Sequence, residues 1–142
     1  MPRRNRWMLV VPIIVALPLA ACEKGASKPA KIRPAQVEHV EGSELSRVTL
    51  TEKAAERLGI ETWMTQSGAG RKVVPYAAVL YDAKGVTWVY TSPANLVFVR
   101  HRITVDYIEG DKAVLTDGPP AGTRVVTVGG QELFGAEFEI GH

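Results

Sequence analysis

The stretch Gly118-Pro119-Pro120-Ala121-Gly122-Thr123-Arg124-Val125-Val126-Thr127-Val128-Gly129-Gly130 decides what kind of fold this chain adopts. Its two prolines and flanking glycines cannot continue a helix or a central strand, so residues 118–123 are predicted to form a fixed turn. Three valines in four positions follow, and then a glycine pair. The pattern predicts a buried strand that stops abruptly, and it marks three structural glycines of the turn and the strand end: Gly118, Gly122 and Gly129.

Short valine-rich runs separated by turn residues continue this theme from Val73 onward. Residues 82–85 and 109–112 have hairpin-turn chemistry. Between them, residues 96–108 alternate with a period of two, which predicts one buried face and one wet face. The expected buried face holds Val97, Val99, Ile103, Val105 and Tyr107, and the expected wet face holds Arg100, Arg102, Thr104 and Asp106. The predicted fold is mainly β: a small antiparallel β-barrel or sandwich with one short helix.

The short helix is predicted over residues 51–59. Thr51 can cap its start, Glu52 and Arg57 suit its two ends, and Gly59 can take the left-handed conformation that stops it. Other expected elements are strands at 47–50, 60–66, 76–81 and 137–140, a flexible joint at 67–70 and one helical turn at 131–135.

The first 21 residues have the layout of a cleaved signal peptide. Three arginines precede an apolar run of about 13 residues, which is too short to span a ~30 Å hydrocarbon layer as a permanent helix. The run ends in Leu19-Ala20-Ala21-Cys22, which resembles a bacterial lipobox, in which the cysteine is diacylated and becomes the new N-terminus. An ordinary signal peptide with an incidental cysteine is the alternative. Cys22 is the only cysteine, so no internal disulfide can form.

Removal of the signal peptide changes the charge balance. Three of the 17 Lys and Arg residues leave with it, so 14 basic residues face 15 acidic ones and the mature net charge is −1. The basic character therefore belongs to targeting, and no nucleic-acid partner is indicated. Residues 22–45 combine lysines, prolines and glycines with no apolar period, which predicts a flexible tether with His39 as a solvated loop residue. The expected organisation is signal peptide 1–21, tether 22–45 and β-domain 46–142.

No set of catalytic, metal-binding or cofactor-binding residues emerges from the spacing. His101 falls on the apolar face of its strand without a second histidine at metal-ligand spacing, so a core histidine bonded to the backbone is the favoured interpretation. Met64 beside Trp63 is ordinary strand content. The glycine pairs lack the Gly-Lys-Ser/Thr of a phosphate loop. We therefore expect a protein that is not an enzyme and has neither cofactor nor metal.

Several runs of the β-domain together resemble one family. They are Val74-Pro75 with Ala78-Val79-Leu80, Gly85 with Trp88-Val89-Tyr90, Phe98-Val99-Arg100 with Val105, and Asp117-Gly118 with Gly122, Val125-Val126 and Gly129. In this order they are similar to the C-terminal part of periplasmic adaptor subunits (membrane fusion proteins) of tripartite efflux pumps. Val48-Thr49-Leu50-Thr51 and Gly59-Ile60-Glu61-Thr62 resemble a segment that such adaptors carry before their lipoyl half-motifs. The resemblance covers most of residues 46–140.

The chain also departs from this family. Full adaptors carry a lipoyl domain and usually a long α-helical hairpin between these two segments, and here residues 67–70 stand in their place. Pro119-Pro120 replaces the usual Gly-Leu start of the turn. The resemblance thus implies the β-barrel and membrane-proximal region alone, without catalytic residues. The missing hairpin is the part through which the family contacts an outer-membrane channel.

These observations favour a lipid-anchored module of the bacterial cell envelope that faces the periplasm or the cell exterior. Its expected partners are the membrane, through the N-terminal lipid, and a membrane transporter or a full-length adaptor, for which it acts as a non-catalytic scaffold. One alternative is a small binding lipoprotein that captures a hydrophobic solute or a metal in its β-domain, and another is a non-functional remnant of an adaptor gene. A barrel interior filled by Val97, Val99, Ile103 and Val105 would favour the scaffold, whereas a cavity lined by them would favour binding.

Overall fold

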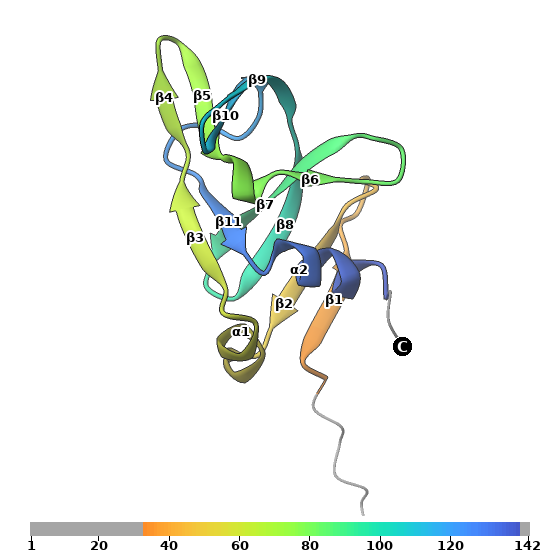
Figure 1. Ribbon diagram of the computed structural model, residues 1–142. Helices are drawn as coiled ribbons and strands as arrows, with labels where there is room; N and C mark the ends of the chain where they lie inside the picture. The colour runs from red at the N-terminus through yellow and green to blue at the C-terminus, as the bar shows by residue number, and fades with distance from the viewer. Residues whose placement is uncertain (1–32, 140–142) are drawn as a thin grey trace, which may run out of the picture. The chain divides into compact units, whose positions relative to one another are not determined.

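The computed structural model describes residues 33–139, which form two antiparallel sheets and their covering helices (Figure 1). The predicted signal peptide, the lipobox with Cys22 and residues 23–32 of the predicted tether lie outside this range. Within the described residues neither sheet closes into a barrel, so the mainly β prediction is confirmed in its sandwich form.

The larger sheet has seven strands and the smaller sheet has four. In spatial order, the larger sheet contains β1 (Ala35–His39), β2 (Ser46–Leu50), β8 (Val97–Arg102), β7 (Thr87–Ala94), β11 (Arg124–Val128) and β3 (Glu61–Met64), with β6 (Leu80–Tyr81) also paired to β7. The smaller sheet contains β4 (Gln66–Gly68), β5 (Arg71–Pro75), β10 (Lys112–Asp117) and β9 (Thr104–Glu109). The helices are α1 (Glu52–Leu58), the 3₁₀ helix η1 (Tyr76–Ala78) and α2 (Gly130–Glu137).

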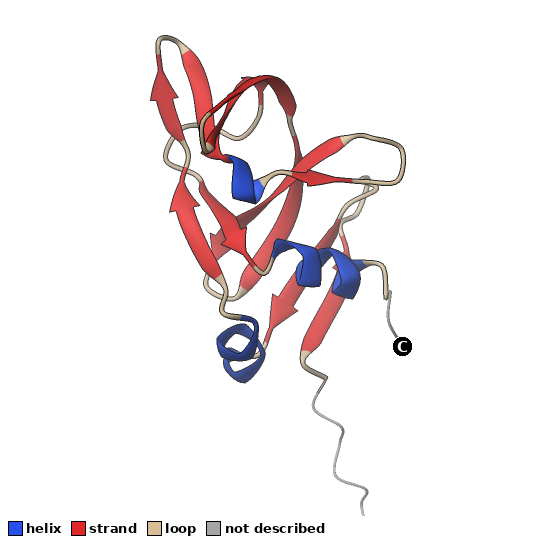
Figure 2. Cartoon of the chain, viewed as in Figure 1, coloured by secondary structure: helices blue, strands red, loops and turns tan. Residues whose placement is uncertain are grey.

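Two apolar cores lie on opposite faces of the larger sheet, because neighbouring residues of one strand belong to different cores. Tyr90 and Val126 belong to the helix-side core, whereas Val89 and Val125 belong to the sheet-side core. Helix α2 covers the first face and lies across β1, β2 and β7 (Figure 2). The helix-side core comprises Val48, Leu50, Ala54, Leu80, Tyr90, Phe98, Val126 and Leu133. The sheet-side core comprises Val74, Ala78, Val79, Val89, Ile103, Ala113, Leu115 and Val125.

Helix α1 forms as its sequence predicts. The Thr51 hydroxyl accepts a hydrogen bond from the backbone N–H of Ala54 at 3.2 Å, which satisfies one of the free donors of the first turn. Gly59 ends the helix in the left-handed region, with φ of 60°, and its N–H turns back to the last helical carbonyls. The capping residues therefore set both ends of this helix.

The three structural glycines occupy the turn and the strand end for three different reasons. Gly122 has a φ of +85° with open space where a Cβ would stand, so only its backbone conformation demands glycine. Gly118 lacks a positive φ, but a Cβ there would meet Leu115 Cδ1 at 2.7 Å. Gly129 has both constraints, with a φ of +89° and a Cβ position 2.3 Å from Ile60 Cδ1.

The boundary between tether and β-domain was predicted wrongly. Strand β1 lies within the expected tether and pairs with β2, with Val37 opposite Val48. His39 is exposed, as expected, but it ends this strand and is not in a loop. The segment lacks an apolar period because β1 is an edge strand with four of its five residues exposed. The ordered domain thus begins before residue 46.

Three other expected elements are wrong in part. Residues 67–70 are not a flexible joint: the first two end strand β4, and Ala69 and Gly70, both with positive φ, form the turn of the β4–β5 hairpin. The expected strand at 76–81 begins as η1 and pairs with the larger sheet only at β6. Residues 130–137 form the two-turn helix α2, so the expected last strand at 137–140 does not begin at residue 137.

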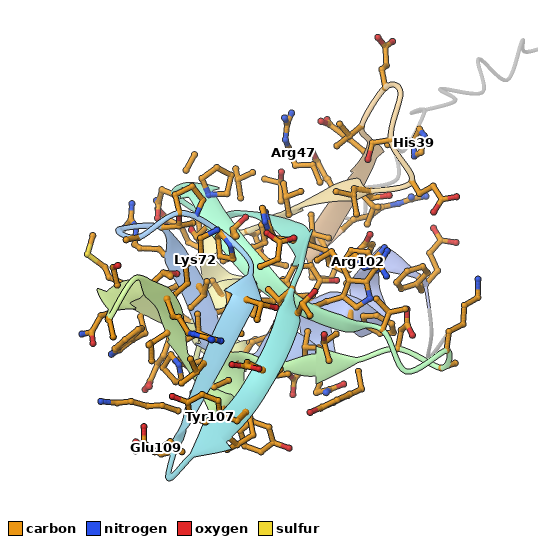
Figure 3. The ribbon with its side chains drawn as sticks, turned by 90° about the horizontal axis from the view of Figure 1, so that it is seen from above. His39, Arg47, Lys72, Arg102, Tyr107 and Glu109 are labelled. Atoms are coloured by element: carbon orange, nitrogen blue, oxygen red, sulfur yellow. The ribbon has the colours of Figure 1, made fainter. Side chains whose placement is uncertain are left out.

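The period of two predicted over residues 96–108 appears in β8, but the expected wet face is wrong there. The stretch breaks at Ile103, where β8 of the larger sheet passes into β9 of the smaller one. Phe98 and Arg100 are only 2% and 6% exposed, because helix α2 covers their face of the sheet. The buried face is also wrong in β9, because Tyr107, which was expected to be buried, is 50% exposed on this free edge strand of its sheet (Figure 3).

Candidate functional site

A buried ion pair joins the end of helix α2 to the centre of the larger sheet. Arg100 Nε on β8 donates to Glu137 Oε2 at 2.7 Å, and the two side chains are 6% and 2% exposed. The hydroxyl of Tyr90 on β7 donates to the same oxygen at 2.5 Å. The backbone N–H of Ser46 on β2 donates to Glu137 Oε1 at 3.3 Å. The carboxylate therefore receives donors from three neighbouring strands, and it fastens the helix to all of them.

The environment of Tyr90 keeps its hydroxyl protonated. Burial, followed by the hydrogen bond to Glu137, raises the pKa of the Tyr90 phenol far above its ordinary range. Tyr90 thus remains a neutral donor at any physiological pH. A buried carboxylate with one cationic and one neutral donor on the same oxygen is a satisfied charge, which is the condition for its burial.

Aromatic rings enclose the Arg100 guanidinium. Its Cζ lies 4.4 Å from the ring centroid of Trp88, 4.7 Å from that of Phe138 and 5.8 Å from that of Phe134. These are distances at which a cation is attracted to the face of a ring. Phe134 and Phe138 also contact each other, with centroids 4.7 Å apart and a tilt of 46°. The charge is therefore held between side chains of a strand and of the terminal helix.

Asp82 orients Trp88 from the β6–β7 turn. Its Oδ2 accepts the indole N–H of Trp88 at 3.1 Å, and its Oδ1 accepts the backbone N–H groups of Lys84 at 2.8 Å and Val86 at 2.9 Å. The bond from Trp88, followed by that from Val86, lowers the pKa of the Asp82 carboxyl. The hairpin turn predicted at 82–85 thus forms, and its aspartate also fixes an aromatic wall.

These side chains line an open groove of about 500 Å³, which we call the aromatic groove. It lies where the β1–β2 turn, the β6–β7 turn and the end of α2 meet. Phe138 is 47% exposed and is one of the lining residues, so it gives the groove an apolar surface. The lining residues are Glu44, Leu45, Asp82, Ala83, Lys84, Trp88, Arg100, Phe134 and Phe138.

The residues singled out in the sequence lie elsewhere. Burial lowers the pKa of His101, which is half-buried on β8, and the opposing charge of Asp117 is the next influence. The ammonium of Lys72 donates to the carbonyl of Gly118, which ties the smaller sheet to the turn. Gly122 and Gly129 take structural positions, as described above. Among residues 33–139, no group of three or more His, Cys, Asp or Glu side chains is placed to hold a metal ion.

Sequence reasoning missed both members of the buried ion pair. It placed Arg100 on a wet face and Glu137 in a terminal strand. One signal was present in the alternation of the two paired strands. Phe98 and Arg100 on β8 lie on the same face of the sheet as Trp88 and Tyr90 on β7. Three of these four residues are large and aromatic. An aromatic cluster around one arginine on a sheet face indicates a covered surface with a counter-charge.

Comparison of the chain with protein-family models, with curated proteins and with solved structures finds no match. No helix within residues 33–139 is long and apolar enough to cross a membrane.

Proposed function

We propose that this chain is a lipid-anchored, adaptor-like β-module of the bacterial cell envelope. It docks on a membrane efflux transporter or on a full-length adaptor, and it acts as a non-catalytic scaffold. Anchoring through Cys22 would place it on the side of the membrane that faces the periplasm or the cell exterior. The family resemblance of residues 46–140 and the layout of the N-terminus support this proposal.

The packing of β8 and β9 is the observation that carries the scaffold function. Ile103 is 2% exposed within the sheet-side core, and Val105 packs against that core. Val97 and Val99 are half-buried on the same side of the sheet. Ile103 and Val105 therefore fill the interior between the sheets, which favours a rigid module over a solute container.

The short connection to the lipid limits where such a module can act. Strand β1 brings the start of the ordered domain forward, so only residues 23–32 separate Cys22 from the first described residue, Arg33. Ten residues can span at most about 33–36 Å. An acylated Cys22 would thus hold the β-domain close to the membrane that carries the lipid, within reach of the extracytoplasmic face of a transporter.

Two experiments test the anchor and the docking. Replacement of Cys22→Ala should release the protein from membranes or leave an unprocessed precursor, and intact-mass analysis of the wild type should show an acylated N-terminus. An unmodified mature N-terminus would contradict the anchor. For docking, photo-crosslinkers at the exposed positions Arg47, Arg102 and Glu109, which lie on three separate strands (Figure 3), should trap an inner-membrane transporter or an adaptor. Recovery of an outer-membrane channel alone, or of no partner at all three positions in native membranes, would count against docking.

The aromatic groove supports a second candidate function. A small binding lipoprotein needs a concave apolar site with a few polar groups, and the groove has this character. It lies on the surface of the domain and not between the sheets, so it differs from the interior cavity that the sequence suggested.

A further inference from the structure

We propose that the aromatic groove binds small amphipathic monocarboxylates, whose apolar body lies on Phe138 and Leu45 and whose carboxylate meets the guanidinium of Arg100. This site sharpens the binding alternative, and it is independent of docking to a transporter. The proposal depends on the unused hydrogen-bonding capacity of Arg100, the apolar wall beside it and the balance of charge around it.

The guanidinium of Arg100 has donors to spare. Only its Nε donates a hydrogen bond within residues 33–139, and it does so to Glu137. A guanidinium carries five N–H donors, of which the terminal four form a fork that fits a carboxylate. Arg100 is one of the residues that line the aromatic groove, where the remaining 6% of its side-chain surface is exposed. Among the hydrogen bonds of residues 33–139, the terminal N–H groups of this arginine are therefore available to a ligand in the groove.

The rings that flank this fork give the site its apolar character. Trp88 and Phe138 lie against the guanidinium at 4.4 Å and 4.7 Å, so both rings restrict its movement and it loses little freedom when a ligand binds. Phe138 keeps 47% of its surface exposed, and Leu45 also lines the groove. An apolar or aromatic group would cover these side chains, which a purely ionic ligand would not do.

The charges around the groove select a single negative charge. Arg100 is already paired with Glu137, and Lys84 adds one exposed cation to the lining of the groove. Glu44 and Asp82 also line the groove, although Asp82 is engaged by Trp88 and the turn N–H groups. Local cations are thus too few for a multivalent anion, whereas one carboxylate can share Arg100 with Glu137 in the fork geometry.

A matched pair of probes tests this assignment on the full-length lipoprotein in lipid nanodiscs, with empty nanodiscs as the blank. Ligand-observed NMR titration with 4-phenylbutyrate should give a Kd on the order of 1 mM or tighter. The alcohol 4-phenylbutanol, which keeps the apolar body and lacks the carboxylate, should bind at least about tenfold more weakly. Equal affinity for the two probes, or no binding of the acid up to about 10 mM, would overturn the proposal.

Variants locate the bound acid. Phe138→Ala should weaken 4-phenylbutyrate by about fivefold or more, because this half-exposed ring lines the groove. Tyr107→Ala removes a ring of similar exposure from the distant β9–β10 hairpin (Figure 3) and should leave the affinity unchanged. Arg100→Lys keeps the charge but loses the fork, and it should abolish the preference for the acid over the alcohol. Equal effects of Phe138→Ala and Tyr107→Ala would show that the acid binds elsewhere.

The carboxylate could also be the end of a peptide. Acetyl-Ala-Phe and its C-terminal amide distinguish this source from a free organic acid. If the peptide acid binds more tightly than 4-phenylbutyrate and the amide does not bind, the site recognises the C-terminal carboxylates of peptides. This result would also support the contact between a carboxylate and Arg100. Tighter binding of the amide than of the peptide acid would overturn the role of Arg100.

Discussion

Replacing Glu137→Gln would leave the Arg100 guanidinium buried without its counter-charge. Both side chains are at most 6% exposed, so solvent screens the lost interaction little. Breaking a buried ion pair from one side costs about 3–5 kcal/mol. Glutamine keeps the shape of the side chain and can still accept from Tyr90, so we expect a loss near the lower end, about 3 kcal/mol. For a domain of this size such a loss lowers Tm by at least about 12 °C.

A double-mutant cycle with Arg100→Met separates the pair from its surroundings. Methionine removes the charge and retains an apolar chain between the rings of Trp88 and Phe138. The double variant should be more stable than the sum of the two single losses predicts, by about 1.5 kcal/mol or more, because it leaves no unpaired buried charge. Urea unfolding followed by circular dichroism measures all four stabilities with one probe.

Glu132→Gln provides the matched control, since Glu132 lies in the first turn of the same helix and is exposed. It should cost no more than about 1 kcal/mol, which is the range of a charge near a helix start. Losses that add within about 0.5 kcal/mol in the double variant would refute the view that Arg100 and Glu137 act as one unit. So would a Glu137→Gln variant as stable as the control.

The remaining predictions concern backbone conformation and pH. Gly129→Ala should lower the free energy of unfolding more than Gly122→Ala in urea titrations, because both have positive φ but only the first Cβ meets Ile60; equal losses would contradict the contact. Burial lowers the pKa of His101, so the unfolded chain binds this proton more tightly and stability falls as pH drops through about 6.5. His101→Gln should therefore reduce the change of Tm with pH between pH 8 and 5.5. A pH dependence of Tm equal to that of the wild type would exclude this group. The pKa of the Asp82 carboxyl is lowered in the folded state, so its ionised form stabilises the fold above about pH 4 and this contribution is lost below it. Asp82→Asn should lower Tm at pH 7, and its Tm should approach that of the wild type near pH 2. A difference in Tm that stays constant with pH would point to packing alone.

Local chemistry made parts of this fold predictable. The cap at Thr51, the stop at Gly59 and the turn at Asp82 each depend on residues within a few positions, and each forms as expected. The strand at Arg124–Val128 was predicted because the prolines and glycines before it fix a turn and its valines favour a buried strand. Such features do not require knowledge of what packs against them, so one sequence is sufficient to predict them.

The candidate site could not be predicted, because its parts meet only through tertiary packing. Arg100 and Glu137 are 37 residues apart, and Tyr90 and Glu137 are 47 apart. A period of two assigns Arg100 to a face, but only the position of helix α2 decides whether that face is wet. Residues 137–140 alternate as a strand would, yet the buried carboxylate of Glu137 is better satisfied at the end of a helix, where donors from three strands reach it.

Arg100 takes part both in the buried ion pair that stabilises the fold and in the proposed binding site, and the coupling between stability and binding can be measured. Glu137 closes the helix-side core, while the next residue, Phe138, lines the aromatic groove, and Arg100 contacts both. A ligand on the fork of Arg100 therefore binds only when α2 is in place, and it stabilises the folded domain by mass action. At ten times its Kd, 4-phenylbutyrate should raise the free energy of unfolding by about 1.4 kcal/mol. At the same concentration Phe138→Ala, with its roughly fivefold weaker affinity, should gain at most about 0.65 kcal/mol. An equal gain in the wild type and in Phe138→Ala would mean that the acid stabilises the domain from outside the groove.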